Sequence, residues 1–308
     1  MVRGIVNRPG PDGPVTFEEL EEPSPGPGEA LVRVGAFSVN RGELSLLARR
    51  PTGWAPGQDV AGTVGRQAAD GSGPPAGTRV VGRAEQGGWS ELVPIATERL
   101  AVLPESVTLE VAATLPIAGL TALRTLRLGG DLLARRVLVT GASGGVGRFH
   151  IELAAASGAT VWAVTGRAEQ AAGLRGLGAE RVIGNVSDAK GRFDLALESV
   201  GGASLAGAVR SLAPRGTIVV FGNSSGETTS LQMQDFIGHE GGRIVTYMSY
   251  AWPEPDGPDL GRLVELLASG RLHPTLGHVS GWQETAGALS LLRERRLVGK
   301  AVLTLPEG

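Results

Sequence analysis

Short apolar runs separated by turn-forming pairs occupy the first third of the chain. The runs lie at residues 30–34, 59–64, 79–82 and 90–94, and pairs such as Pro25-Gly26 and Gly87-Gly88 lie around them. Because glycine and proline favour the turns that join short strands, this pattern predicts a β-rich, barrel-like domain with one helix over residues 41–49. From 109 to 128 the apolar positions recur at helical spacing, interrupted by Pro116 and Gly119.

Strand-like and helix-like patterns alternate from residue 136 onward, which predicts a doubly wound parallel sheet with crossover helices. The final segment should return to the β-rich domain as helices 259–269 and 283–293 and a strand over 300–305. The predicted domains are therefore 1–118 with 251–308, and 119–250. The six buried-strand runs of the parallel sheet lie at 137–140, 160–164, 181–183, 195–197, 217–221 and 243–247.

Composition restricts the function classes. The 29 basic and 31 acidic residues form no basic cluster, which argues against a nucleic-acid or anionic membrane partner. No signal peptide is recognised, and no segment approaches the roughly 20 apolar residues of a membrane span, so we expect a cytoplasmic protein. The chain has no cysteine, which excludes disulfides, thiolate catalysis and sulfur-ligated zinc.

A glycine-rich turn follows the run at 137–140 and precedes a helical pattern over 146–157. The turn reads Ala142, Ser143, Gly144, Gly145, Val146, Gly147. Gly144 would let a phosphate approach the backbone, and Gly147 would let the helix pack against the strand. We predict that residues 143–147 bind the pyrophosphate of a dinucleotide, and the alternative is a tight turn without a ligand.

The end of the next strand indicates which dinucleotide is bound. Enzymes that prefer NAD usually place an acidic residue there, whereas this chain has Thr165, Gly166 and Arg167. A guanidinium can form paired hydrogen bonds with a 2′-phosphate, so we predict NADPH. The alternative for Arg167 is a solvated surface position. A short-chain reductase would need a tyrosine four residues before a lysine, and neither Tyr247 nor Tyr250 has one.

Several motifs follow one another in a fixed order over nearly the whole chain. They are VNRGE at 39–43, PGQDVAG at 56–62, ATLPIAGLTAL at 113–123, ESVGG at 198–202, VFG at 220–222 and GKAVL at 299–303. With these motifs the chain resembles the medium-chain dehydrogenase/reductases, in the zinc-independent quinone oxidoreductase (zeta-crystallin-like) branch. The resemblance implies a Rossmann domain inserted into a discontinuous GroES-like catalytic domain.

The zinc-dependent alcohol dehydrogenases of this superfamily provide a contrast. The places that match their catalytic zinc ligands hold Asn40, Gln58 and Ile117, which are not a plausible zinc set. The histidines are scattered without metal-like spacing, and we expect them to serve in packing or at the surface: His150, His239, His273 and His278. Without a Lewis acid, hydride transfer to a carbon that is already electron-poor is favoured over alcohol oxidation.

The resemblance also implies roles for individual residues. Asn40 and Thr121 would lie near the nicotinamide and take part in catalysis, although a turn-forming asparagine and a helix threonine bonded to its own backbone are alternatives. Lys300 would contact the pyrophosphate. Further cofactor contacts would come from strand ends at Ser199, Val200, Phe221 and Gly222.

Some features leave the chemistry open. Many relatives have a tyrosine after the early asparagine, and its absence here leaves Glu43, Ser45 or solvent as the proton donor. Trp54 and Trp89 either line a substrate pocket or pack in the core.

We therefore predict an NADPH-dependent, metal-free reductase of a small-molecule quinone or α,β-unsaturated carbonyl. The alternatives are a specialised biosynthetic reductase or reductive cyclase, and a non-catalytic NADPH-binding or redox-sensing protein. The last sheet strand, at 243–247, would leave an exposed edge, so we expect a homodimer formed through it.

Overall fold

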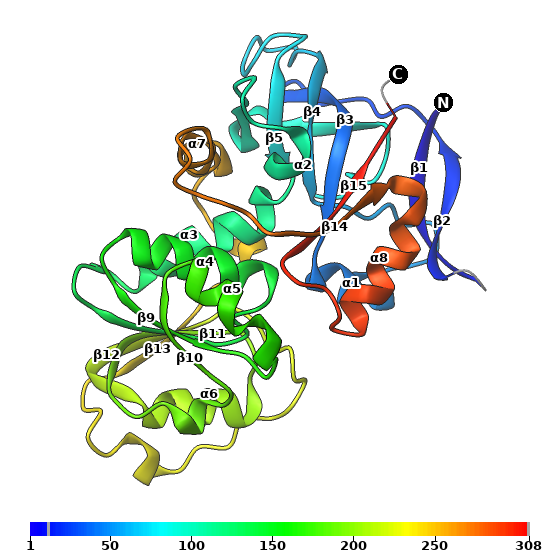
Figure 1. Cartoon of the computed structure of the whole chain (residues 1–308). Helices are drawn as coiled ribbons and strands as arrows, with labels where there is room; N and C mark the ends of the chain where they lie inside the picture. The colour runs from blue at the N-terminus through cyan, green and yellow to red at the C-terminus, as the bar shows by residue number, and fades with distance from the viewer. Residues whose placement is uncertain (11–12, 307–308) are drawn as a thin grey trace. The chain divides into compact units, whose positions relative to one another are not determined.

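The computed structural model describes residues 1–10 and 13–306 (Figure 1). The chain forms two compact units. The first comprises Met1–Leu120 with Glu254–Gly308, and the second comprises Thr121–Pro253. The predicted boundaries after residues 118 and 250 lie within a few residues of these positions.

A six-stranded parallel sheet forms the centre of the second unit. Its order reverses between β8 and β11, which is the doubly wound arrangement of a Rossmann domain, so the predicted fold class is confirmed. Across the sheet the strands are β10 (Ala179–Ile183), β9 (Thr160–Val164), β8 (Arg136–Val139), β11 (Phe193–Glu198), β12 (Leu212–Val220) and β13 (Arg243–Thr246).

Helices cover both faces of this sheet. α4 (Gly145–Ala156) and α5 (Ala171–Gly176) lie on one face, and α6 (Gly202–Arg210) lies on the other (Figure 1). Strands covered on both faces are apolar throughout rather than alternating, which is why β8 and β11 are buried along most of their length.

The first unit contains the predicted β-rich domain. Its main sheet runs in the order β14, β15, β3, β4, β5, β7, and β6 also pairs with β3. The C-terminal β15 pairs antiparallel with β3, so the predicted return of the chain end is confirmed. The bounds are β3 (Glu29–Val39), β4 (Asp59–Arg66), β5 (Arg79–Arg83), β6 (Leu92–Ala96), β7 (Leu100–Val102), β14 (Leu276–Gly281) and β15 (Lys300–Thr304).

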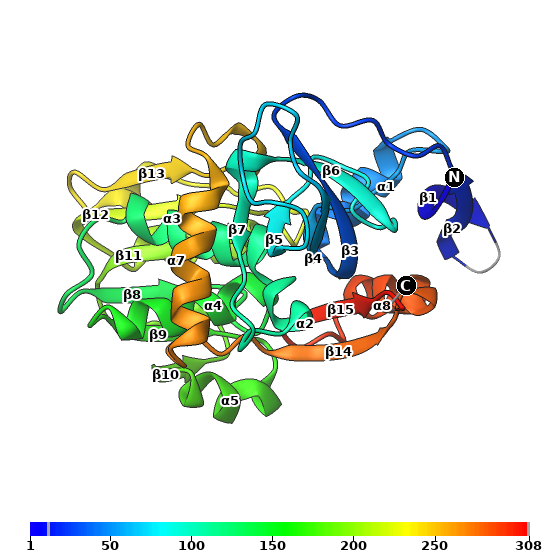
Figure 2. The same ribbon diagram turned by 90° about the horizontal axis from the view of Figure 1, so that it is seen from above.

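Helices pack around this sheet, among them α1 (Arg41–Arg49), α7 (Asp256–Ala268) and α8 (Thr285–Arg293). α1 has the predicted bounds and contacts α8, as Figure 1 shows. α7 contacts β5 and β7 (Figure 2). Four of the described strands were not expected from the sequence: β7, β14, and the separate antiparallel pair β1 (Val2–Gly10) and β2 (Gly13–Leu20).

The two tryptophans that the sequence placed in loops have different environments. Trp89 is fully buried and stacks on Phe37 with ring centroids 5.6 Å apart, so it belongs to the core. Trp54 is half-buried against that core, and its Nε1 donates to Gln86 Oε1 at 2.8 Å.

A helical run over Leu109–Leu128 corrects one expectation. It consists of α2 (Leu109–Ala112), a π-helical turn (Leu115–Gly119) and α3 (Leu120–Leu128). With 20 residues and a mean hydropathy of 1.3, it is long and apolar enough to cross a membrane, so the expectation that no segment approaches this length is wrong. However, 72% of its apolar window is buried inside the protein, as in a core helix.

Candidate functional site

A buried polar cluster lies where three strands of the first unit meet. Asp59 begins β4, Ser38 lies opposite it in β3, and Lys300 begins β15 beside the same end of β3. Asn40 and Glu43 belong to the first turn of α1, directly after β3. We call these five residues the Asp59 cluster. The antiparallel pairing of β3 with both β4 and β15 assembles it from distant parts of the sequence.

Asp59 is the hub of the cluster. Its carboxylate accepts hydrogen bonds from Ser38 Oγ at 2.5 Å, Asn40 Nδ2 at 2.8 Å, the Ile117 backbone N–H at 2.8 Å and Lys300 Nζ at 3.1 Å. Three of these donors bond to Oδ2 and the Ile117 N–H bonds to Oδ1, so both carboxylate oxygens are hydrogen-bonded. Its negative charge is therefore compensated although the side chain is completely buried.

Lys300 fixes the orientation of the Asn40 amide. Its Nζ lies 2.5 Å from Asn40 Oδ1, 3.2 Å from the Val39 carbonyl oxygen and 3.1 Å from Asp59 Oδ2. The ammonium thus uses its three donors, and its side chain is 4% exposed. The amide oxygen of Asn40 faces Lys300 and the nitrogen faces Asp59, which leaves one Nδ2 hydrogen for another acceptor. A pyrophosphate contact of Lys300 stays a prediction and would require it to release one of these partners.

Glu43 is a buried acid next to this hub. Its Oε2 accepts from the Asn40 backbone N–H at 2.6 Å, and its Oε1 accepts from the Gln58 backbone N–H at 3.2 Å. Burial, and secondly the negative charge of Asp59, raise the pKa of Glu43 to about 8. Glu43 is therefore a neutral acid at neutral pH, whereas the other candidate side chain for proton donation, Ser45, is exposed on α1.

The three residues at the places that match zinc ligands all donate hydrogen bonds to these carboxyl groups. Asn40 and Ile117 donate to Asp59, and the backbone of Gln58 donates to Glu43. All three residues are half-buried. An amide, a second amide and an aliphatic side chain do not fit zinc, which takes nitrogen, sulfur and carboxylate ligands. Among the described residues, no group of three or more His, Asp or Glu side chains could hold a metal ion.

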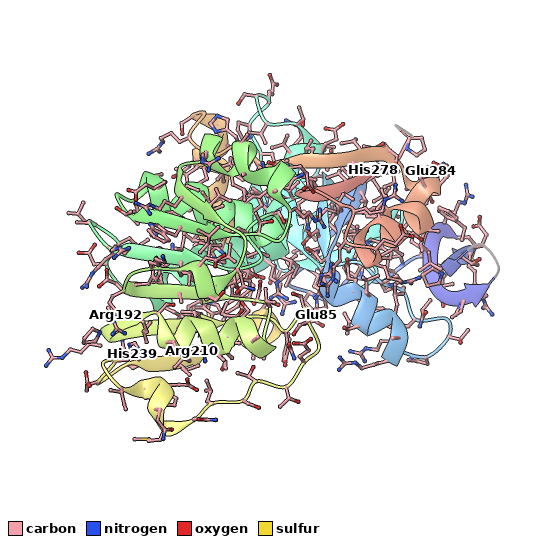
Figure 3. The ribbon with its side chains drawn as sticks, turned by 60° about the horizontal axis from the view of Figure 1, so that its bottom comes forward. Glu85, Arg192, Arg210, His239, His278 and Glu284 are labelled. Carbon is pink, nitrogen blue, oxygen red and sulfur yellow. The ribbon has the colours of Figure 1, made fainter. Side chains whose placement is uncertain are left out.

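The histidines do not change this conclusion. His239 lies close to Arg192 and Arg210 in Figure 3, and Arg192 Nη1 is 2.6 Å from His239 Nδ1. This ring nitrogen is thereby in contact with a protein group, and His278 Nε2 contacts Ser280 Oγ at 3.0 Å in β14.

The glycine turn of the second unit has the geometry of an anion site. Gly144 precedes α4, and no side chain caps this helix start. The N–H groups of the first helical turn, which includes Gly145, Val146 and Gly147, have no intrahelical acceptors and concentrate positive potential. Ser143 lies in the turn itself and is half-buried.

Two glycines in this turn are required by shape. Gly141 has a φ of 58°, which is the left-handed conformation that glycine adopts readily and other residues avoid. No role was predicted for this glycine from the sequence. A Cβ at Gly147 would lie 2.6 Å from Gly141 O and 2.7 Å from Ala142 Cα, so α4 packs directly on the turn as its sequence predicts.

Buried Glu198 organises the neighbouring strand ends, a role that the sequence did not reveal. Its Oε1 accepts from Thr140 Oγ1 and the Val200 backbone N–H, both at 3.1 Å, and its Oε2 accepts from the Gly201 N–H at 3.0 Å. The only signal was its place in the ESVGG motif. Phe221 donates its N–H to Glu198 O at 3.0 Å.

The predicted contacts at the ends of β11 and β12 are brought together by this arrangement. Ser199 N donates to Thr140 Oγ1 at 3.0 Å, and a Cβ on Gly222 would lie 3.1 Å from Ser199 O. Ser199 and Val200 therefore lie beside Phe221 and Gly222 at the carboxyl edge of the sheet, where ligands of this fold bind.

The remaining predicted residues of the second unit lie on two other segments. Gly166 and Arg167 follow β9, and a Cβ on Gly166 would meet only open space. Thr121 lies in the first turn of α3 and is buried. Its carbonyl oxygen accepts a hydrogen bond from Thr125 Oγ1 at 2.6 Å.

Comparison with known proteins shows which proteins this chain resembles. Residues 177–303 match a family model described as zinc-binding dehydrogenase. The chain is 29% identical over 310 residues to quinone oxidoreductase of Pseudomonas aeruginosa, covering 93% of this chain and 94% of that protein. It is 28% identical over 319 residues to prostaglandin reductase-3 of Bos taurus, covering 92% and 83%. These matches confirm the resemblance of the chain to the medium-chain dehydrogenase/reductase superfamily, in its quinone oxidoreductase branch.

Solved structures and a much longer relative extend the comparison. It matches the crystal structure of AibC with a TM-score of 0.88 at 27% identity, covering 99% of this chain and 96% of that one. The Escherichia coli quinone oxidoreductase complexed with NADPH has the same fold, with a TM-score of 0.88 at 23% identity, covering 98% and 99%.

The longer relative is the spectinabilin polyketide synthase system protein NorB of Streptomyces orinoci. The chain is 30% identical to it over 293 residues, which is 91% of this chain but only 13% of NorB. The chain therefore spans a small part of that protein, in contrast to its near full-length match with the quinone oxidoreductase.

Proposed function

We propose that this chain is an NADPH-dependent oxidoreductase that reduces a quinone or an α,β-unsaturated carbonyl compound without a metal ion, in the cytoplasm. The donor set at the three zinc-matching places is the observation that carries the metal-free part: the Asn40 amide is bonded to Asp59 and Lys300, and the other two places hold an amide, Gln58, and an aliphatic side chain, Ile117. The description of the matching family as zinc-binding dehydrogenase does not fit the donor set of this chain.

The second unit supports the choice of cofactor. The uncapped start of α4 would hold the pyrophosphate through residues 143–147, and Arg167 would pair with the 2′-phosphate. The fold is shared with the NADPH complex of Escherichia coli quinone oxidoreductase. The strand-end residues Ser199, Val200, Phe221 and Gly222 would line the same edge. Bound NADPH would supply a hydride.

The residues of the first unit would then act on the substrate. Hydride addition to an enone or quinone leaves negative charge on oxygen, and a fixed hydrogen-bond donor stabilises such charge. Asn40 has one amide hydrogen available, and Lys300 and Asp59 hold that amide in a single orientation. Glu43, which accepts the backbone N–H of Asn40, keeps its proton at neutral pH and is the acid of this cluster. Solvent would supply the proton that completes the product.

A specialised biosynthetic reductase is the second candidate. It is favoured by the similarity to part of NorB, a protein of a polyketide synthase system. Such an enzyme would use the same hydride and the same donor on an unsaturated acyl chain.

A turnover panel tests the proposal. Purified protein treated with a chelator is incubated with NADPH and simple quinones, enones and unsaturated thioesters, and NADPH oxidation is followed by absorbance. We expect turnover that the chelator does not reduce. Binding of NADPH without oxidation across the panel would favour a redox-sensing protein, and loss of turnover with the chelator would contradict the metal-free mechanism.

A further inference from the structure

His150 is a buried histidine in α4, the helix that follows the glycine turn. Its side chain is fully buried. Its Nε2 lies 2.7 Å from Thr125 Oγ1 in α3, and its ring meets the ring of Phe221 edge-on, with centroids 5.0 Å apart at 69°. One side chain therefore joins three segments: α4, α3 and the residue after β12.

The hydrogen bonds of Thr125 determine which ring nitrogen of His150 carries the proton. A hydroxyl has one hydrogen, and Thr125 Oγ1 donates it within α3, to Thr121 O at 2.6 Å with Ala122 O at 3.2 Å. Thr125 can then only accept from His150. The imidazole must be the Nε2–H tautomer, and Nδ1 accepts no hydrogen bond from any residue that the structure describes.

The three segments that meet at His150 are those assigned to the cofactor. Thr121 is the predicted nicotinamide-side residue, Phe221 is a predicted cofactor contact at a strand end, and α4 begins at the predicted pyrophosphate site. Two consecutive hydrogen bonds, from His150 to Thr125 and from Thr125 to Thr121 O, connect α4 to the first turn of α3. The ring contact limits the rotation of Phe221.

We propose that His150 is a positioning residue that holds Thr121 and Phe221 in place relative to the pyrophosphate-binding start of α4. The inference rests on the proposed binding of NADPH. His150 acts through a hydrogen bond and a ring contact and transfers no proton. Burial lowers its pKa to about 3, so the ring stays neutral at every pH at which the enzyme would be assayed.

Two substitutions of Thr125 separate positioning from stability. Thr125→Val keeps the volume but removes the oxygen that accepts from His150, whereas Thr125→Ser keeps that oxygen and removes a buried methyl group. We expect Thr125→Val to raise the dissociation constant of NADPH or lower kcat by roughly three- to tenfold, the range of one hydrogen bond. Thr125→Ser should stay within about twofold in both, although its melting temperature falls as expected for a lost methyl group.

His150→Phe provides the other half of the test. It keeps an aromatic ring against Phe221 and removes the Nε2–H donor. His150→Phe and Thr125→Val delete the same hydrogen bond, so their effects should not add. The dissociation constant of the double variant for NADPH should not exceed the larger of the two single-variant values. In nitrogen NMR spectra of the wild type, one histidine should remain in the Nε2–H form from pH 5 to pH 8.

The outcomes distinguish this inference from the proposed function. Wild-type affinity and kcat in both Thr125→Val and His150→Phe, or an Nδ1–H tautomer for His150, would overturn the positioning role alone. A wild-type protein that binds neither NADPH nor NADH in a fluorescence titration would overturn both the function and the inference.

Discussion

Arg167 follows β9 at a point where the chain leaves room for a ligand, since a Cβ on the preceding Gly166 would meet only open space. Its identity, together with the absence of an acid in this position, was the sequence signal for NADPH. The structure keeps the segment at the carboxyl end of a sheet strand, which is where the ribose of a dinucleotide lies in this fold.

The first prediction concerns the cofactor preference. Arg167→Ala should weaken NADPH binding roughly 10- to 100-fold, because a charge-assisted hydrogen bond contributes about 1.5–3 kcal/mol. NADH affinity should change little, since NADH has no 2′-phosphate. Fluorescence titration with both nucleotides measures the difference. Arg175→Ala, at an exposed arginine of α5, is the matched control. Equal losses for NADPH and NADH in Arg167→Ala would contradict the assignment.

The second prediction concerns Glu43 and pH. The pKa of its side chain is about 8 in the folded protein and near 4.5 as a free side chain, so the folded state retains a proton that the unfolded state releases. Stability is therefore lost as pH rises from about 4.5 to about 8. Glu43→Gln removes this titration, and its unfolding free energy should rise relative to wild type over that window.

Urea unfolding at pH 5, 6.5 and 8 measures the effect of Glu43→Gln. Glu43→Gln should also lower the unfolding free energy by the same amount at every pH. Both carboxyl oxygens accept a backbone N–H, and in the variant one of these N–H groups would face the amide nitrogen instead. Only the pH-dependent part reports the buried acid, and Glu105→Gln at an exposed site is the control. A difference from wild type that is the same at all three pH values would refute the raised pKa.

At the scale of elements, the start of α4 depends on one close packing contact. The Cβ of an alanine at Gly147 would overlap backbone atoms of Gly141 and Ala142, which cannot move without shifting the turn. Gly147→Ala should therefore destabilise the protein by about 1–3 kcal/mol, the usual cost of overpacking. It should also weaken both NADPH and NADH, because the pyrophosphate is common to them.

A matched glycine tests whether this effect comes from the contact. Gly261 lies inside α7, and a Cβ there would have nothing within 4 Å. Gly261→Ala should stabilise the protein by about 0.5–1 kcal/mol, as alanine is favoured in a helix. Thermal unfolding and nucleotide titration of the two variants make the comparison. Normal binding and stability in Gly147→Ala would show that the turn has more room than the structure indicates.

The pattern of apolar residues predicted most of the helices and strands but missed some of them. The parallel strands were predicted because each contains a run of apolar residues, and α1 was predicted with its bounds. β14 was missed because glycine, histidine and serine interrupt its two apolar residues and its positions alternate between half-buried and exposed. Its pairing with β15 is what makes it a strand, and pairing partners are not visible in a local pattern.

At the scale of the whole molecule, β13 lies at the edge of the parallel sheet as predicted. Unpaired edges are usually covered. Exposed apolar side chains are concentrated in this part of the described chain, at Met233, Ile237, Ile244, Met248 and Tyr250. We therefore propose that two copies pair through β13.

Light scattering tests the assembly. The wild type should have about twice the chain mass of 31.7 kDa. Ile244→Lys should yield a monomer, because a charge on the paired edge opposes strand addition. Val279→Lys, at an exposed position of the edge strand β14 in the other sheet, should remain a dimer. A monomeric wild type, or a dimer broken only by Val279→Lys, would reject this interface.

The sequence by itself determined the parallel sheet, the glycine turn and the absence of a sulfur-ligated metal. These depend on residue types and on spacings within a few positions, which a local reading captures. It also placed Asn40, Glu43 and Gln58 near the chemistry through motifs, but without their hydrogen-bond partners.

Only the tertiary structure decided how those residues are used. Lys300 and Asp59 are 241 positions apart and meet because β15, β3 and β4 pair in one register. His150 was expected to serve in packing or at the surface, and it became a link between Thr125 and Phe221 only when α4, α3 and β12 packed together. Strand register and helix packing are set by the energy of the whole fold, so the partners of a buried polar group cannot be derived from its neighbours in the chain.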